Sequence, residues 1–266
     1  MSAPTALPDS ADAAPLDTPR RSFGDLLRGN YDLFVQPLIA IVALVVVITV
    51  VYNGQLDEIE KLSLAPAFVL SSLGKHLVLT ALSTVAVLVI AVPLGILVSR
   101  PRARRAQGFV LTIGGFAQAL PPFGVLVLLA FLIAFGTPTA ILGLTLAALL
   151  PVLRNTVVGL QQVDQALIEA ARGMGMSARA TLFRVELPLA VPVIVAGLRV
   201  ALVLNVGNAV LASYIGGGGL GDIVVQSLTL SRTPVLIVSG TIIAALALLV
   251  DWLAGLVERI IVARSG

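Results

Sequence analysis

The stretch QQVDQALIEAARGMGMSARATLFRVELPLAVP, residues 161–192, separates two long apolar segments and decides what kind of protein this chain is. A simple connection between neighbouring helices takes roughly two to eight residues, and this one is far longer. Asp164 is a suitable N-cap for a short helix that runs through Arg172. Gly173 and Gly175 follow, and glycine readily adopts the left-handed backbone that ends helices.

A second short helix is expected after these glycines. Ser177 can cap it, and it should run to about Glu186. Pro188 then lies just inside the next apolar segment, where a missing N–H costs little. This pattern predicts a helix, a tight turn and a helix at a membrane surface, which either dock a partner protein or lie along the lipid headgroups. One face of the first helix should carry the small and apolar side chains of Leu167, Ala170, Ala171 and Met174.

The rest of the chain is unusually apolar. Of its 266 residues, 58% are hydrophobic and 12% are charged, against about half and about a quarter in soluble domains. This composition excludes a disordered protein and argues against a water-soluble globule. The net charge of +3 is too small to indicate a nucleic-acid-binding protein. With no cysteine, and with His76 as the one histidine, no metal site is expected.

The apolar residues form blocks with the length of transmembrane helices, since roughly 20 helical residues span a hydrocarbon core of ~30 Å. The third block is interrupted by Pro121-Pro122, so it is either one span or two half-helices, and the fourth block is short. The six blocks cover residues 33–51, 76–99, 108–136, 138–153, 187–214 and 234–257.

The positive charges outside these blocks give the orientation, because short cytoplasmic loops retain Lys and Arg. Thirteen of the sixteen lie before the first block, after the second, after the fourth or after the sixth. The other three, Lys61, Lys75 and Arg232, lie on the opposite side. We therefore predict an all-α membrane protein with six transmembrane helices and both termini in the cytoplasm.

The predicted regions differ in composition. Residues 1–30 are rich in Pro, Ala, Ser and Asp, cannot bury a core, and are expected to form a disordered cytoplasmic tail. Residues 31–52 are expected to form the first transmembrane helix. Residues 73–258 make up the predicted permease core, which includes the cytoplasmic loop at 161–187.

This loop resembles the EAA signature of permease subunits of bacterial ABC importers. The resemblance rests on Glu169-Ala170-Ala171, Gly173 and Leu187-Pro188, in a cytoplasmic loop before the penultimate span. It implies a coupling helix that fits a groove on a cytoplasmic ATPase, with the glycine making the turn and the alanines allowing close approach. The residues to which this role carries over are Glu169, Ala170, Ala171, Gly173, Gly175, Ser177, Leu187 and Pro188.

Further stretches resemble the osmoprotectant branch of these importers, which carries glycine betaine, choline, carnitine and similar amines. They are LLPVLRNTVVGL at 149–160, EAARGMGMS at 169–177, VELPLAVPVIVAGLR at 185–199 and IGGGGLGD at 215–222. The resemblance implies a core of five helices like that of a methionine importer, plus one N-terminal helix, in the bacterial inner membrane. It also implies alternating access, with an ABC ATPase dimer, a second permease copy or paralogue, and a separate extracytoplasmic substrate-binding protein.

The chain is not expected to be an enzyme. It contains no GxxxxGK[ST] phosphate loop, so no cofactor is expected on it, and ATP and Mg should bind to the partner ATPase. Two alternatives remain open. One is an importer of another compatible solute or an amino-acid derivative, and the other is a secondary carrier or channel that works without an ATPase.

Polar and helix-breaking residues inside the apolar blocks are candidates for a transport path, because membrane proteins tolerate them mainly where they face a cavity or another helix. The alternative for the amides is hydrogen bonding between helices. Arg199, within the fifth block, should snorkel inward or pair with Glu186 or Asp251. The path candidates are Gln118, Pro121, Pro122, Asn205, Asn208 and Ser213.

Two further features are expected to be structural. The GLGD sequence at 219–222 matches the GxGD pattern of intramembrane aspartyl proteases, but the predicted topology places the other candidate carboxylate, Asp32, at the opposite membrane edge. The glycine run at 216–219 should therefore make a tight turn near the outer gate. His76 is expected at the outer membrane interface.

Overall fold

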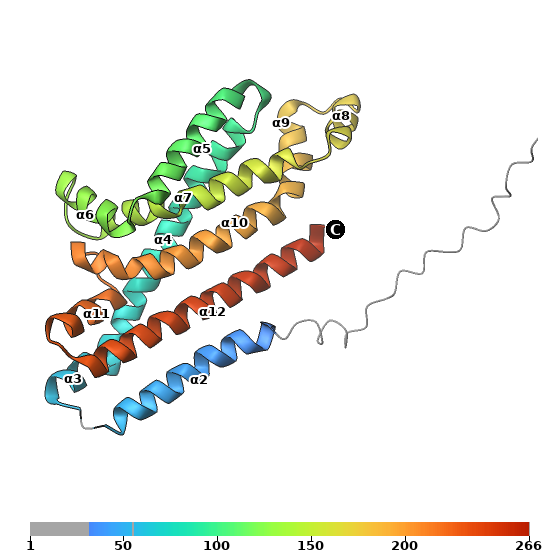
Figure 1. Ribbon diagram of the computed structural model, residues 1–266. Helices are drawn as coiled ribbons and strands as arrows, with labels where there is room; N and C mark the ends of the chain where they lie inside the picture. The colour runs from blue at the N-terminus through green and yellow to red at the C-terminus, as the bar shows by residue number, and fades with distance from the viewer. Residues whose placement is uncertain (1–31, 55, 266) are drawn as a thin grey trace, which may run out of the picture.

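The computed structural model describes residues 32–54 and 56–265, which form helices and turns without any strand. The predicted tail, residues 1–30, lies outside the described residues. Short helical segments η1 (Pro101–Ala103), η2 (Leu182–Glu186, a π-helical turn) and η3 (Ala209–Ile215) join longer helices. The α-helices in Figure 1 are α2 (Asp32–Tyr52), α3 (Glu58–Ser63), α4 (Pro66–Val98), α5 (Arg104–Ala119), α6 (Pro122–Leu132), α7 (Thr137–Gln161), α8 (Gln165–Gly173), α9 (Ala178–Thr181), α10 (Leu187–Asn208), α11 (Leu220–Thr229) and α12 (Thr233–Ser265).

Five helices of the described chain are long and apolar enough to cross a membrane: α2, α4, α7, the continuous run from α9 through η3, and α12. The pair α5–α6 passes the same test together but bends by 97°. Proline forces the residue before it out of the helical region, and Leu120 has an extended ψ of 139°. The predicted all-α membrane architecture is confirmed, and its third block consists of two half-helices.

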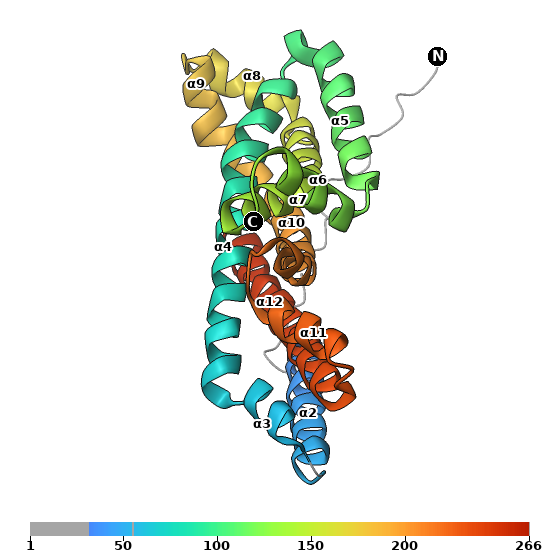
Figure 2. The ribbon, with the colours of Figure 1, turned by 90° about the vertical axis from the view of Figure 1, so that its left-hand side faces the viewer.

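The bundle has two ends, which we name by their features. The α8 end carries α8 and α9, and Figure 1 shows the C-terminal part of α12 and the start of α2 directed to the same side. The glycine-turn end carries residues 216–219, α3 and α11, and Figure 2 views the bundle from this end. Gly136 N donates to Ile215 O at 2.7 Å, which places the start of α7 here too.

Three helices, α4, α7 and α10, form the centre of the bundle. Small residues let these helices approach closely. A Cβ built at Gly95 of α4 would lie 2.7 Å from the Thr156 side chain of α7, and one at Gly197 of α10 would lie 2.6 Å from Asn155 Nδ2. Such small-residue contacts are typical of membrane helices, because lipid supplies no hydrophobic force that drives helices together.

The N-terminal helix α2 is held against α12 by polar contacts. Gln36 Nε2 donates to Asp251 Oδ2 at 2.8 Å and to Leu248 O at 3.2 Å. Arg199 of α10 contacts the same Asp251 carboxylate, with its Nε 2.6 Å from Oδ1, and its Nη1 lies 3.2 Å from Glu258 Oε2. The expected pairing of Arg199 with Asp251 is confirmed, whereas its pairing with Glu186 is not seen.

Several helix boundaries differ from the predicted blocks. The helix α4 begins at Pro66 rather than His76, α7 continues to Gln161, and α12 continues to Ser265. Their extensions carry polar residues, which hydropathy assigns to loops although the helical hydrogen bonding continues. The helix α11 was not predicted, since its 10 residues are too few to form a span.

Alanine at Gly197 should destabilise the protein, whereas alanine at Gly207 on the same helix should not. A Cβ at Gly197 would also lie 2.8 Å from Pro151 O, and overpacking of this kind costs about 1–3 kcal/mol. A Cβ at Gly207 meets nothing within 4 Å, and alanine is the better helix former by about 1 kcal/mol. Thermal unfolding in detergent should give a lowered Tm for G197A and an equal or raised Tm for G207A. Equal Tm values for the two variants would contradict this packing.

Candidate functional site

The helix α8 is the first part of the loop that the sequence singles out. The Asp164 side chain caps it by accepting a hydrogen bond from Ala166 N at 2.9 Å, as the sequence predicts. The helix includes Gly173, and the left-handed residue that follows it is Gly175, with φ 85°. The expectation that Gly173 makes the turn is therefore wrong. Both residues are glycines, and the spacing alone did not distinguish them.

The two faces of α8 differ in exposure. Glu169 and Ala170 are exposed, and Leu167 and Met174 are 49% and 78% exposed. Ala171 is buried at 2% exposure, so it packs against the rest of the chain rather than sharing the exposed face as expected. An exposed apolar surface at this end of the bundle has the composition of a docking site for another protein.

The second helix of the loop is not separate from the following span, which corrects the predicted helix-turn-helix. Ser177 caps α9 by accepting from Ala180 N at 3.2 Å, and the backbone then continues through η2 into α10. Leu187 N bonds to Leu182 O, one residue further back than in an α-helix. Pro188 lies in the first turn of α10, and the π-turn accommodates its missing donor without breaking the helix.

An ion pair joins the N-terminal end of α10 to the C-terminal end of α4. Arg100 Nη1 lies 2.7 Å from Glu186 Oε2, and the Glu186 side chain is only 5% exposed. A cavity of about 530 Å³ lies beside the pair, bounded by α8 and by the ends of α4 and α7. The sequence alone does not predict this pair, because its members are 86 residues apart and Arg100 has the pattern of an ordinary loop charge.

The candidate path residues have different surroundings. Gln118 is exposed on α5, and Pro121 and Pro122 form the bend before α6. Asn205 is fully buried, and its Nδ2 donates to Thr84 Oγ1 at 3.1 Å. Asn205 therefore makes the interhelical contact that was the structural alternative for the amides.

The other two candidates lie towards the glycine-turn end. Asn208 is half-buried at the end of α10, and Ser213 Oγ donates to Gly218 O at 3.2 Å. Next to Ser213, the exposed ring of Tyr214 packs edge-on with Phe123 of α6, with ring centroids 5.2 Å apart. The sequence alone does not predict this aromatic pair, since only the fold brings its two members together.

The glycine run makes the expected tight turn. Gly216, Gly218 and Gly219 have positive φ values of 76°, 80° and 104°, which side chains with a Cβ rarely adopt. His76 lies beneath this turn, fully buried, with Nε2 3.0 Å from Val206 O. A carbonyl only accepts, so Nε2 carries a proton. Because α4 begins at Pro66, His76 is packed inside the bundle, and its expected position at the outer membrane interface stays a prediction.

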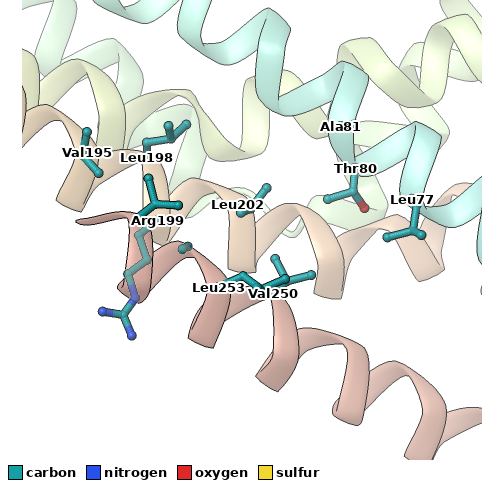
Figure 3. A pocket seen from close by; sticks show the side chains of 11 residues that line it. Leu77, Thr80, Ala81, Val195, Leu198, Arg199, Leu202, Val250 and Leu253 are labelled. Carbon is teal, nitrogen blue, oxygen red and sulfur yellow. The ribbon is translucent and has the colours of Figure 1, made fainter. Parts of the chain in front are cut away.

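An apolar groove of about 380 Å³ lies between α4, α10 and α12. Figure 3 shows Leu77 of α4, Leu202 of α10 and Val250 of α12 lining it, while the Arg199 guanidinium points away from these side chains. Arg199 thus leaves its aliphatic stem in the groove and places its charge in the ion-pair cluster.

The variant Arg100→Met should destabilise the N-terminal end of α10, because it leaves the Glu186 carboxylate buried without a cation. Removing one partner of a buried pair costs about 3–5 kcal/mol, an upper value here since the Arg100 side chain is 34% exposed. The double variant R100M/E186Q should recover part of the loss, because it removes the unpaired charge. Hydrogen exchange across residues 164–190 is the measurement. Equal exchange in the wild type and both variants would contradict a structural role of the pair.

Comparisons with known proteins agree with this architecture. The family model described as the binding-protein-dependent transport system inner membrane component matches residues 91–262. The chain is 38% identical over 194 residues to the carnitine transport permease protein OpuCD of Listeria monocytogenes serotype 1/2a (strain 10403S), covering 73% of this chain and 86% of that protein. It is 42% identical over 179 residues to the osmoprotectant import permease protein OsmY of Salmonella typhimurium, covering 67% of this chain and 76% of that protein.

Solved structures place the fold in the same group. An inward-facing MetNI methionine ABC transporter aligns with a TM-score of 0.65 and 25% identity, covering 73% of this chain and 95% of that chain. The sequence resemblance to ABC importer permeases is thereby confirmed. The chain belongs to the family of binding-protein-dependent transport system inner membrane components, and it is a multi-pass protein of the bacterial inner membrane.

Proposed function

We propose that this chain is the permease subunit of an ATP-driven importer for osmoprotectant quaternary amines such as glycine betaine, carnitine and choline. The single observation that carries the proposal is the exposed face of α8, in a chain whose curated relatives include carnitine and osmoprotectant permeases. A subunit of this kind is not catalytic itself. ATP and Mg would bind to a separate ABC ATPase dimer in the cytoplasm.

The proposed ATPase contact is the loop from 161 to 187, within a permease core at 73–258. Leu167, Ala170 and Met174 would enter a groove on the ATPase, while the buried Ala171 lets α8 sit close to its own chain. The exposed Glu169 would reach a polar group at the rim. The complete set proposed for coupling is Glu169, Ala170, Ala171, Gly173, Gly175, Ser177, Leu187 and Pro188.

The proposed orientation places the α8 end in the cytoplasm and the glycine-turn end outside. It is supported by the positive charges outside the predicted apolar blocks, thirteen of which precede or follow those blocks on the side assigned to the cytoplasm. This orientation would place both termini in the cytoplasm. The glycine-turn end would then face a separate substrate-binding protein, and a second copy or paralogue of the chain would complete the path.

The proposed coupling works through one continuous element. A displacement of α8 by the ATPase would move α9, which is helically continuous with α10. The Arg100–Glu186 pair would carry the motion to α4, and the Arg199 contacts would carry it to α12. Moving such an equilibrium most of the way from one state to the other needs roughly 5.5 kcal/mol of differential binding, which ATP binding to the partner can provide.

The proposed transport path runs past candidate residues that are exposed or half-buried in this chain. Gln118, Pro121, Pro122 and Asn208 are the retained candidates, with Ser213 at the turn, whereas the buried Asn205 is proposed as an interhelical contact. The exposed Phe123–Tyr214 pair adds aromatic faces, which attract quaternary ammonium groups.

Two other functions are less well supported. An importer for another compatible solute or an amino-acid derivative would use the same machinery. A secondary carrier or channel would leave the exposed α8 face without a use, and it would keep transporting when that face is altered.

Gly173→Trp should disrupt docking without unfolding the permease. A Cβ at Gly173 meets nothing within 4 Å in this chain, so the added side chain starts in open space on the face proposed to meet the partner. Overpacking of one contact corresponds to roughly a tenfold weakening of ATPase binding. Co-purification of the ATPase and solute uptake should both fall. G108W, at an equally open glycine of α5, is the control. Unchanged co-purification and uptake in G173W would refute the coupling role.

The binding protein that serves this permease should bind at least one of glycine betaine, carnitine and choline. Tight recognition of a quaternary ammonium relies on aromatic faces, which the binding protein is proposed to supply. Calorimetric titration of that protein with each solute is the measurement. Absence of binding to all three would overturn the substrate class and leave the permease assignment intact.

A further inference from the structure

A cavity with a mixed apolar and polar lining opens at the glycine-turn end of the bundle. Its volume is about 680 Å³, within the ordinary range for small-molecule sites. It is bounded by the first half of α4, the start of α7, the turn at 216–218 and α11. Two opposite charges line it, Lys75 from α4 and Asp222 from the first turn of α11.

These two charges differ from the others at this end of the described chain. Lys61 is paired with Glu58 at 2.8 Å, and Arg232 is paired with Asp57. Glu60 accepts a hydrogen bond from Asp57 N in the capping box of α3. In contrast, neither Lys75 nor Asp222 has an ion-pair partner among the residues that the structure describes.

Both side chains pass close to Gly218. A Cβ built at this glycine would lie 3.7 Å from Asp222 Oδ2 and 3.7 Å from Lys75 Cδ. The two side-chain atoms are therefore no more than twice that distance apart, and they flank a space that a side chain at residue 218 would fill. The space is open because Gly218 has no Cβ, and its left-handed backbone, with φ 80°, favours glycine at this position. Two unpaired opposite charges across one small space fit a small molecule that carries both signs.

We propose that this cavity is a subsite for the zwitterionic members of the substrate class, an inference that rests on the proposed function. Lys75 Nζ donates to the solute carboxylate, and Asp222 faces the quaternary ammonium. A quaternary ammonium has no N–H to donate, so Asp222 attracts it through charge alone. Choline carries a hydroxyl in place of the carboxylate, and therefore uses Asp222 but not Lys75.

The site is weak because Lys75 is exposed to solvent. Exposed charge contacts change binding by only a few fold, since water and salt screen them. A weak site suits a point at which a solute leaves the binding protein and moves on. The subsite therefore selects between solutes by a small factor and does not hold them.

The test is uptake into proteoliposomes that contain the complete transporter, driven by its own binding protein, with glycine betaine, carnitine and choline as solutes. K75M should lower uptake of the two zwitterions roughly two- to fivefold and leave choline uptake unchanged. K75R should restore zwitterion uptake. D222N should lower uptake of all three solutes. K61M is the matched control, because Lys61 lies at the same end and is paired, and the Glu58 hydrogen bond raises the pKa of Lys61.

A second measurement separates the subsite from a docking contact. The affinity of the binding protein for the reconstituted transporter should be the same in K75M and in the wild type. A weakened affinity, or an equal loss of uptake for every solute in K75M, would show that Lys75 contacts the binding protein and would overturn the subsite alone. Unchanged zwitterion uptake in K75M would also overturn it. Wild-type transporter that moves none of the three solutes would instead refute the proposed substrate class, and the subsite with it.

Discussion

Hydrocarbon offers no hydrogen-bond partner to a peptide group or a charge, and the rest of this structure depends on that constraint. Within the described residues, the backbone bonds mainly to itself in helices, and several polar side chains inside the bundle find partners within the chain. Asn205 reaches Thr84, and Arg199 reaches Asp251 and Glu258. Close helix packing follows from the same constraint, since Gly95 and Gly197 permit the contacts that lipid cannot promote.

The continuity of α9, η2 and α10 links the bundle to the exposed face of α8. A separate surface helix would move independently of the spans, whereas a helix that continues into a span moves with it. The π-turn makes this possible, because it carries the chain past Pro188 without breaking the helical path. The Arg100–Glu186 pair then ties the same point to α4, so two central helices share one buried contact beside the loop.

The sequence predicted the parts of the fold that depend on local properties. The apolar blocks located the spans, and Asp164 and Ser177 located the starts of α8 and α9 because capping needs only a few neighbouring residues. It failed where two neighbouring residues offer the same chemistry, as with Gly173 and Gly175. It also failed where polar residues continue a helix, as at the start of α4.

The sequence by itself determined that the chain is an all-α membrane protein, that a long loop precedes the penultimate span, and that this loop has the signature of importer permeases. Hydropathy, loop charge and short motifs can be read along the chain, so no folding is needed to find them. Only the tertiary structure decided that Glu186 pairs with Arg100, that Phe123 meets Tyr214, and that Lys75 and Asp222 line one cavity beside Gly218. These contacts join residues far apart in the chain, and their geometry exists only when the helices are packed.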